Sequence, residues 1–283
     1  MDSLTNQLSP ANNPAPAESA ASPPPLPPFI SPPSIPCPDL AAPTRPWGFW
    51  ATLGFSLTIL IAGFMAQAAV GMVFAVVAIA LGHQTLLQNP EALSSHGLML
   101  SLATLGDTPV VIGLSILFAW LRKGIAVKEY LGFKRPAFKE IRRWCLWLLL
   151  MVVATDCTSL LTGRSIVPDF MVKVYHSAGF LPLLWFVIVV AAPVSEEIIF
   201  RGFFFTGLEH SRVGGIGAIV ITSLVWAAIH LQYDVYGMGM IFVGGLLLGL
   251  CRLKTGSVWL CICLHALMNL IATIELVYWP NVT

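Results

Sequence analysis

The sequence predicts an all-α bundle of transmembrane helices, and its composition, its long apolar runs and the placement of its charges all support this. Hydrophobic residues make up 57% of the 283 residues and charged residues only 10%, and the mean hydropathy is +0.80. A soluble domain carries about 25% charged residues, so the composition argues against an ordinary soluble protein. We therefore expect a polytopic membrane protein that is surrounded by the lipid bilayer.

Seven apolar segments are expected to form the helices. They are residues 47–82, 97–121, 144–162, 181–208, 215–232, 237–252 and 257–279. The first segment, at 1.5 Å per residue, would reach about 54 Å, whereas the hydrocarbon core of a bilayer is ~30 Å thick. It is therefore either one long tilted helix or a tight hairpin, and a hairpin would raise the number of helices to eight.

The distribution of Lys and Arg predicts the orientation. Loop 122–143 carries eight of them: Arg122, Lys123, Lys128, Lys134, Arg135, Lys139, Arg142 and Arg143. Basic residues are enriched in cytoplasmic loops, so this loop and the N-terminus are expected in the cytoplasm. No organelle address is visible, and we expect an integral protein of a bacterial inner (cytoplasmic) membrane.

The chain divides into three parts by composition. Residues 1–46 hold 14 of the 21 prolines and are expected to be a disordered tail that acts as a spacer. Residues 47–180 are expected to hold N-terminal transmembrane helices and the basic loop, and residues 181–279 a catalytic core. The net charge of +1 gives no reason to expect a nucleic-acid partner.

Three charged residues interrupt the apolar segment 181–208. A charge at the centre of a bilayer costs about 2.5–3.5 kcal/mol, so charges there usually have a function. Glu197 and Arg201 are four residues apart, with the acid first, which predicts an ion pair along the helix. Glu196 is rotated by about 100° from Glu197 and cannot share that arginine, which leaves it as a candidate general base. Pro193 is expected to kink the helix and open space beside Glu196.

Polar residues also interrupt two later apolar segments. His230 ends one of them, and His265 and Asn269 share a face of another because they are four residues apart. A glutamate base, a histidine beside it, and a histidine–amide pair that holds an oxyanion could together hydrolyse a peptide bond. Alternatively, Glu196, His230 and His265 could bind Zn²⁺ as a His₂Glu set with one position left for water. No HExxH motif supports the zinc alternative, and both remain open.

The same residues resemble a known family. The order Glu196-Glu197-xxx-Arg201, Trp226-xxx-His230 and His265-xxx-Asn269 is similar to the EExxxR, FxxxH and HxxxN/D motifs of the CAAX protease and bacteriocin-processing (CPBP) family. These intramembrane endopeptidases include the type II CAAX prenyl proteases. The resemblance covers about residues 181–275, and it departs from the family pattern at Trp226, where phenylalanine is usual. This substitution is expected to narrow the cavity and to leave the chemistry intact.

The resemblance implies a role for each residue. Glu196 would activate water with the assistance of His230, His265 and Asn269 would stabilise the oxyanion, and Glu197 and Arg201 would support the site. The family has been described both as metalloproteases and as metal-independent glutamate peptidases, so the resemblance implies either type.

The expected function is an intramembrane endopeptidase that cleaves a membrane-associated protein or peptide. A transporter would also use intramembrane acids, such as Asp107 and Asp156, but paired repeats are not visible. For these two acids we expect hydrogen bonds between helices. A non-catalytic scaffold that binds partners through the proline-rich tail is the third alternative.

Overall fold

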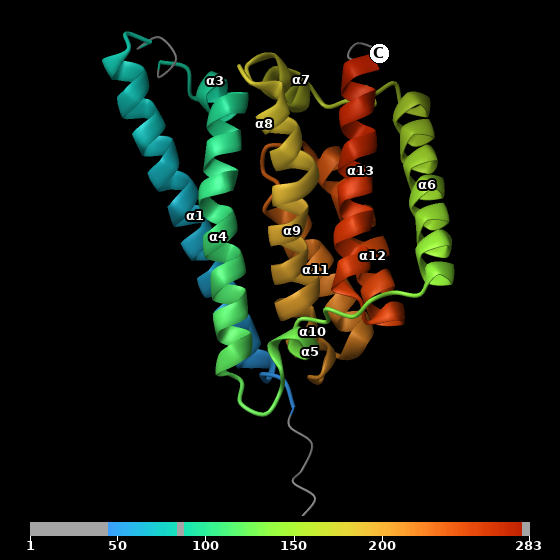
Figure 1. Cartoon of the computed structure of the whole chain (residues 1–283). Helices are drawn as coiled ribbons and strands as arrows, with labels where there is room; N and C mark the ends of the chain where they lie inside the picture. The colour runs from blue at the N-terminus through green and yellow to red at the C-terminus, as the bar shows by residue number, and fades with distance from the viewer. Residues whose placement is uncertain (1–44, 84–87, 279–283) are drawn as a thin grey trace, which may run out of the picture. The chain divides into compact units, whose positions relative to one another are not determined.

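The computed structural model describes residues 45–83 and 88–278. The predicted tail, residues 1–46, therefore lies almost entirely outside the described residues. The described chain belongs to one compact unit, and it consists of helices joined by loops (Figure 1). Its α-helices are α1 (Phe49–Ala80), α3 (Pro90–Ser94), α4 (Gly97–Leu121), α5 (Val127–Tyr130), α6 (Phe138–Leu161), α7 (Asp169–His176), α8 (Leu181–Phe186), α9 (Ala192–Glu197), α10 (Phe205–Glu209), α11 (Gly214–Ala228), α12 (Val235–Thr255) and α13 (Val258–Tyr278).

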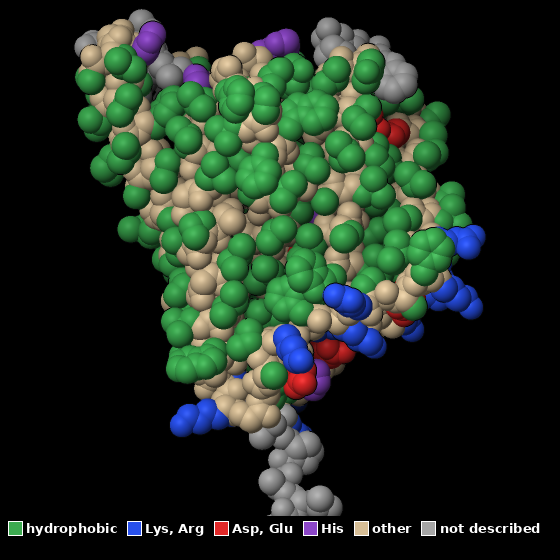
Figure 2. Space-filling model, viewed as in Figure 1, with side chains coloured by type: hydrophobic (Ala, Val, Ile, Leu, Met, Phe, Trp, Pro, Cys, Tyr) green, Lys and Arg blue, Asp and Glu red, His purple; other side chains and the backbone are tan. Residues whose placement is uncertain are grey.

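The described chain has six helices long and apolar enough to cross a membrane, counting Leu181–Glu209 as one. Their outer faces expose large apolar side chains, such as Phe64 of α1 at 70% and Leu161 of α6 at 87%. Figure 2 shows hydrophobic side chains along the sides of the bundle, whereas Lys and Arg gather at one end. An apolar surface of this extent requires lipid, and the prediction of an all-α membrane bundle is confirmed.

The first apolar segment is one continuous helix rather than a hairpin. Helix α1 has 32 residues, so it is about 48 Å long and must tilt to fit a bilayer. It packs along α4 (Figure 1), where Gly63 lies against Val111 and Gly106 lies against Val70. The alternative of eight helices, which depended on a hairpin, is therefore not realised.

The fifth apolar segment forms a shorter helix than expected. Helix α11 has 15 residues, about 22 Å, which is less than the thickness of the hydrocarbon core. It ends at Ala228, so His230 lies in the turn that follows the helix. The Asp234 carboxylate accepts a hydrogen bond of 2.8 Å from the Gly237 N–H and thereby caps α12. The polar cap, rather than the end of the apolar run, determines where the next helix begins.

Helix α6 begins six residues earlier than the expected residue 144. Its first turn carries Glu140, whose carboxylate accepts a 2.9 Å hydrogen bond from the Ala137 N–H. This bond satisfies a backbone donor that the helix itself leaves unpaired. Because the capped turn is polar, a search for apolar segments does not include it.

Residues 181–209 form one continuous helix with two π-helical segments, Val187–Ala191 (η1) and Ile198–Phe204 (η2), on either side of α9. Pro193 lies just after the first of these segments. Proline has no N–H, and its ring clashes with the carbonyl four residues earlier, so a wider turn relieves both problems. In the apolar 18-residue stretch of this helix, 50% is buried inside the bundle. This share is larger than in the other described spanning helices. The Glu196–Glu197 pair thus lies on the central helix, between two irregular turns.

Helix α12 packs closely against α11 through two glycines. A Cβ on Gly245 would lie 2.8 Å from Ser223 Cβ, and one on Gly249 would lie 3.2 Å from Ile219 Cγ2. The glycines therefore allow the two backbones to approach each other. Such small-residue faces are typical of helix contacts in membranes, and Gly245 and Gly249 form one on α12.

Candidate active site

The predicted ion pair between Glu197 and Arg201 is present and completely buried. Arg201 Nη1 lies 2.9 Å from Glu197 Oε1, and neither side chain is exposed. Arg201 also donates a 3.3 Å hydrogen bond to the Gly245 carbonyl, and its guanidinium carbon lies 4.6 Å from the centre of the Trp226 ring. The ion pair therefore links the central helix to α11 and α12.

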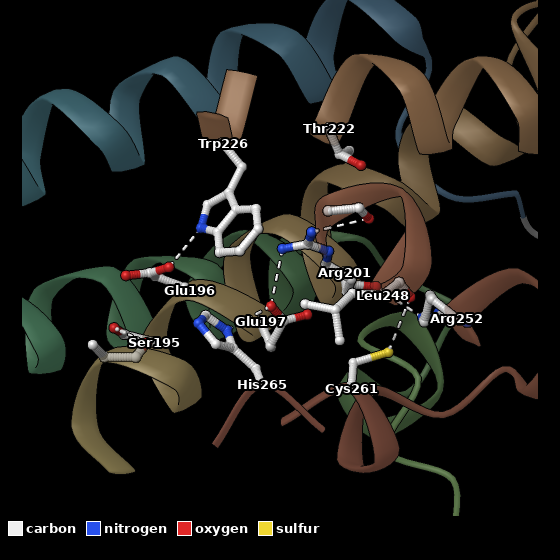
Figure 3. A network of polar contacts seen from close by, with 12 residues as sticks. Ser195, Glu196, Glu197, Arg201, Thr222, Trp226, Leu248, Arg252, Cys261 and His265 are labelled. Atoms are coloured by element: carbon white, nitrogen blue, oxygen red, sulfur yellow. Dashed lines mark hydrogen bonds and ion pairs between the residues drawn. The ribbon is translucent and has the colours of Figure 1, made fainter. Parts of the chain in front are cut away.

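His265 contacts the same glutamate from α13. Its Nδ1 lies 3.0 Å from Glu197 Oε1 and the residue is 3% exposed (Figure 3). An ionised carboxylate only accepts hydrogen bonds, so Nδ1 carries the proton in this contact. The other ring nitrogen, Nε2, is then left for a substrate or a water molecule. Glu197 thus orients His265, which the sequence predicts to be catalytic. The spacing of the motifs does not reveal this contact.

Glu196 is hydrogen-bonded to Trp226. The indole Nε1 lies 2.5 Å from Glu196 Oε2 (Figure 3). As predicted, Glu196 does not share Arg201, and it remains partly exposed whereas Glu197 is buried. From the sequence, Trp226 was expected only to narrow the cavity, and this hydrogen bond was not predicted. The available signal was the indole N–H, a donor that needs an acceptor when it is buried among apolar residues.

His230 adjoins the site through Trp226. Its Nδ1 lies 2.7 Å from the Trp226 carbonyl oxygen, and the two rings meet nearly edge to face with centres 5.4 Å apart. The Trp226 ring also lies 5.2 Å from the His265 ring. The indole therefore lies between the two imidazoles, and within residues 45–83 and 88–278 no hydrogen bond joins His230 directly to Glu196.

Asn269 contacts the first π-helical segment. Its Nδ2 donates a 2.8 Å hydrogen bond to the Ile188 carbonyl. The amide group has two N–H donors, so this bond leaves the second one for another acceptor. The contact holds α13 against the irregular turn that precedes Glu196.

Asp107 of α4 lies near Glu196. It is close enough to Glu196 for the two carboxylates to interact electrostatically, and it is hydrogen-bonded to Gln67 of α1. The expected hydrogen bond between helices is therefore confirmed for Asp107. One of its oxygens, Oδ1, is buried without a hydrogen-bond partner among the described residues.

The residues of the Zn²⁺ alternative, Glu196, His230 and His265, do not lie together as a group of ligands in this arrangement. In the part of the chain that the structure describes, no three His, Cys, Asp or Glu side chains form a group that could hold a metal ion. The Nδ1 atoms of both histidines are engaged, by Glu197 and by a backbone carbonyl, and among the described residues each Nε2 remains free. We therefore derive no catalytic step through a metal.

Comparison with known proteins points to the same residues. Residues 178–271 match the family model described as type II CAAX prenyl endopeptidase Rce1-like, whereas no curated protein and no solved structure matches the chain. The matched segment begins just before α8 and includes Glu196, Trp226, His230, His265 and Asn269. Over residues 178–271, the predicted resemblance to the CAAX protease family is thus confirmed.

Proposed function

We propose that the protein is an intramembrane endopeptidase that hydrolyses a peptide bond in a membrane-associated protein or peptide. The match to a protease family supports a hydrolase. The observation that carries the proposal is the contrast between two adjacent glutamates. Glu197 is buried and held by Arg201 and His265, whereas Glu196 is partly exposed and, among the described residues, accepts a hydrogen bond only at Oε2.

Glu196 is the proposed general base. Its Oε2 is occupied by the Trp226 N–H, so Oε1 is the oxygen that faces a water molecule. In the proposed reaction Oε1 takes a proton from that water as its oxygen attacks the scissile carbonyl carbon. The carboxyl then returns the proton to the leaving amine when the carbon–nitrogen bond breaks.

His265 and Asn269 are the proposed donors to the oxyanion. The second Asn269 N–H can reach a developing negative charge without breaking the bond to Ile188. His265 would donate from Nε2 with a proton on both ring nitrogens, while its Nδ1 stays hydrogen-bonded to Glu197. Such fixed donors typically contribute about 10²–10³ in rate.

His230 is proposed to assist Glu196. Its Nδ1 is held by the Trp226 carbonyl, so its Nε2 is free to bind the attacking water. The imidazole lies in a turn rather than inside a helix, and it can therefore adjust its position when a substrate binds.

The orientation of the protein in the membrane completes the proposal. We place the end that carries loop 122–143 in the cytoplasm, in accordance with the charge rule, and the membrane that we propose is a bacterial inner membrane.

Cleavage of a fluorescence-quenched peptide by the purified full-length chain tests the proposed function. We expect Glu196→Gln to abolish cleavage while the thermal unfolding midpoint stays unchanged, because the amide keeps the shape and loses the base. Farnesylated and unmodified versions of one peptide show whether the enzyme recognises a lipid. If the wild type cleaves both and Glu196→Gln cleaves them equally well, the proposal is wrong.

The same cleavage assay in the presence of a metal chelator tests the metal alternative. Cleavage that persists in the chelator and is lost in Glu196→Gln supports a glutamate peptidase. Cleavage that is lost in the chelator and restored by added Zn²⁺ supports a metalloprotease instead.

A further inference from the structure

A pocket of about 470 Å³ lies away from the Glu196 site, at the basic end of the bundle. It is lined by α5 and the loop that follows it, by α10 and by the end of α12, and its lining includes Lys128, Glu129, Lys134, Thr206, Glu209 and Arg252. Its volume falls in the range of about 300–1,000 Å³ that is usual for small-molecule sites. Thr206 is ten residues beyond Glu196 along the helix, so the pocket is about 15 Å from the proposed base.

Two hydrogen bonds join the loop after α5 to the residues that follow α12. Ser257 Oγ donates a 2.5 Å hydrogen bond to the Lys134 carbonyl, and the Val258 N–H donates one of 2.8 Å to the Gly132 carbonyl. Gly132 has a φ of +76°, and a Cβ there would lie 2.4 Å from Arg252 Nη2. The loop is thus built so that the arginine can lie flat against its backbone.

Arg252 is a buried cation without an acidic partner. It is only 6% exposed, and it donates hydrogen bonds to the Arg201 carbonyl (2.8 Å, from Nε) and to Thr206 Oγ1 (3.1 Å, from Nη2). Within residues 45–83 and 88–278 it forms no ion pair, although Glu209 lines the same pocket. Its guanidinium carbon lies 5.5 Å from the centre of the Phe205 ring, and Glu209 interacts with it electrostatically without forming an ion pair. Nη1 has no hydrogen-bond partner among these residues, so one end of the buried guanidinium is free to bind a ligand.

The side chains around the pocket complement Arg252. The exposed Lys128 and Lys134 add two positive charges at its mouth, and the exposed Glu129 and the half-buried Glu209 add two carboxylates that accept hydrogen bonds. Guanidinium groups bind phosphate through paired N–H donors, and carboxylates accept hydrogen bonds from hydroxyl groups. The site therefore suits a ligand that carries both a phosphate and hydroxyl groups.

We propose that this pocket binds a phosphate-bearing, hydroxylated group, with Arg252 as its anchor and Lys128 and Lys134 as its outer contacts. The pocket lies at the basic end of the bundle (Figure 2), where the headgroups of an anionic phospholipid would be. Basic pockets next to transmembrane helices bind such headgroups in other membrane proteins. A soluble phosphate compound could supply the same phosphate and hydroxyl groups, and the experiment below distinguishes it from a lipid headgroup.

Thermal unfolding of the full-length protein in a non-ionic detergent tests the site. The probes are short-chain phosphatidylglycerol, short-chain phosphatidylcholine and inorganic phosphate, each titrated to give an apparent affinity. We expect phosphatidylglycerol to raise the unfolding midpoint more than phosphatidylcholine does. The double variant Lys128→Gln/Lys134→Gln should bind phosphatidylglycerol roughly tenfold more weakly, or worse, because it lacks two cations at the mouth of the pocket.

The control variant, Lys123→Gln/Lys139→Gln, removes two exposed charges outside the pocket. It should keep the affinity of the wild type. If both double variants weaken binding equally, or if none of the probes shifts the midpoint, the pocket is not a phosphate site and the proposal fails. A shift with inorganic phosphate as large as that with the lipid would assign the site to a soluble anion, whereas a shift with the lipid alone would assign it to the headgroup.

Discussion

The indole N–H of Trp226 and the carboxylate of Glu196 are joined by a hydrogen bond of 2.5 Å. A hydrogen bond to an ionised acceptor is short and about twice as strong as a neutral one. It restricts Glu196 to one side-chain conformation and leaves one of its oxygens for water. In the FxxxH motif of the family that this segment resembles, phenylalanine is usual at this position. Phenylalanine has no hydrogen-bond donor, so the contact with Glu196 is a departure of this chain from that motif.

Replacement of Trp226 by phenylalanine should lower the cleavage rate. The ring would still pack between the two imidazoles, but the hydrogen bond to Glu196 would be lost. A bond to a charged group contributes about 1.5–3 kcal/mol, so we expect kcat/KM to fall by roughly 10- to 100-fold. Steady-state kinetics on the quenched peptide measure this effect.

The matched control is Trp120→Phe, at an exposed position of α4 that is 65% accessible. It should leave kcat/KM unchanged. An unaltered rate in Trp226→Phe as well would show that the hydrogen bond does not contribute to catalysis.

The Glu197–Arg201 pair should contribute mainly to stability. Removal of one partner leaves an uncompensated buried charge, which costs about 3–5 kcal/mol. We therefore expect Glu197→Ala to lower the free energy of unfolding by about that amount and to lower the yield of folded protein. Denaturant titration in detergent measures the first quantity.

The double variant Glu197→Gln/Arg201→Met removes both charges and should recover much of this stability. It should remain inactive, because His265 has lost the carboxylate that orients it. Equal instability of the single and double variants would contradict the proposed cause.

Gly245→Ala should weaken the packing of α12 against α11. The added methyl group would lie 2.8 Å from Ser223 Cβ and 3.1 Å from Ser223 Cα, so the backbones would have to separate. Overpacking of this kind costs about 1–3 kcal/mol, and the shift would also disturb the Gly245 carbonyl that Arg201 contacts.

Gly239 of the same helix is the control. A Cβ there meets no atom within 4 Å, and Gly→Ala inside a helix gains up to about 1 kcal/mol. Thermal unfolding should therefore show a lower midpoint for Gly245→Ala and an equal or higher midpoint for Gly239→Ala. The reverse order would refute the packing argument.

Asp234 should make stability depend on pH in the acidic range. The Gly237 N–H, and then Arg164 at 2.6 Å, hold the pKa of the Asp234 carboxyl below its usual value. A group whose pKa is lowered by folding contributes stability above its unfolded pKa of about 3.9 and loses that contribution as the pH falls through its folded pKa. The unfolding midpoints of wild type and Asp234→Ala should differ at pH 7, and the difference should shrink as the pH falls below about 4 and through the lowered pKa of Asp234.

Asp234→Ser separates the cap from the charge. Serine can accept the same hydrogen bond from the helix but has no charge to lose. Its unfolding midpoint relative to that of Asp234→Ala should therefore not change with pH, and convergence of these two variants in acid would count against the role of the carboxylate.

Residue type and spacing alone predicted much of the fold and part of the site. Apolar runs longer than about 20 residues must cross a bilayer as helices, because lipid cannot satisfy exposed backbone groups. Residues four apart share a helix face, so the Glu197–Arg201 pair followed directly from the sequence. Local signals of this kind require no knowledge of which helices are neighbours. They are weaker at helix ends, where the polar caps at Glu140 and Asp234 shifted the boundaries.

Contacts between helices required the tertiary structure. The sequence placed His265 and Trp226 on segments far from the glutamates, and only the packing of α11 and α13 around the central helix brings His265 to Glu197 and Trp226 to Glu196. Arg252 is similar, since its position in the chain resembles that of an ordinary basic residue at the end of a helix. The sequence determined which polar groups are buried in the bundle, and the tertiary structure decided which of them meet, because hydrogen bonds depend on distances that only helix packing sets.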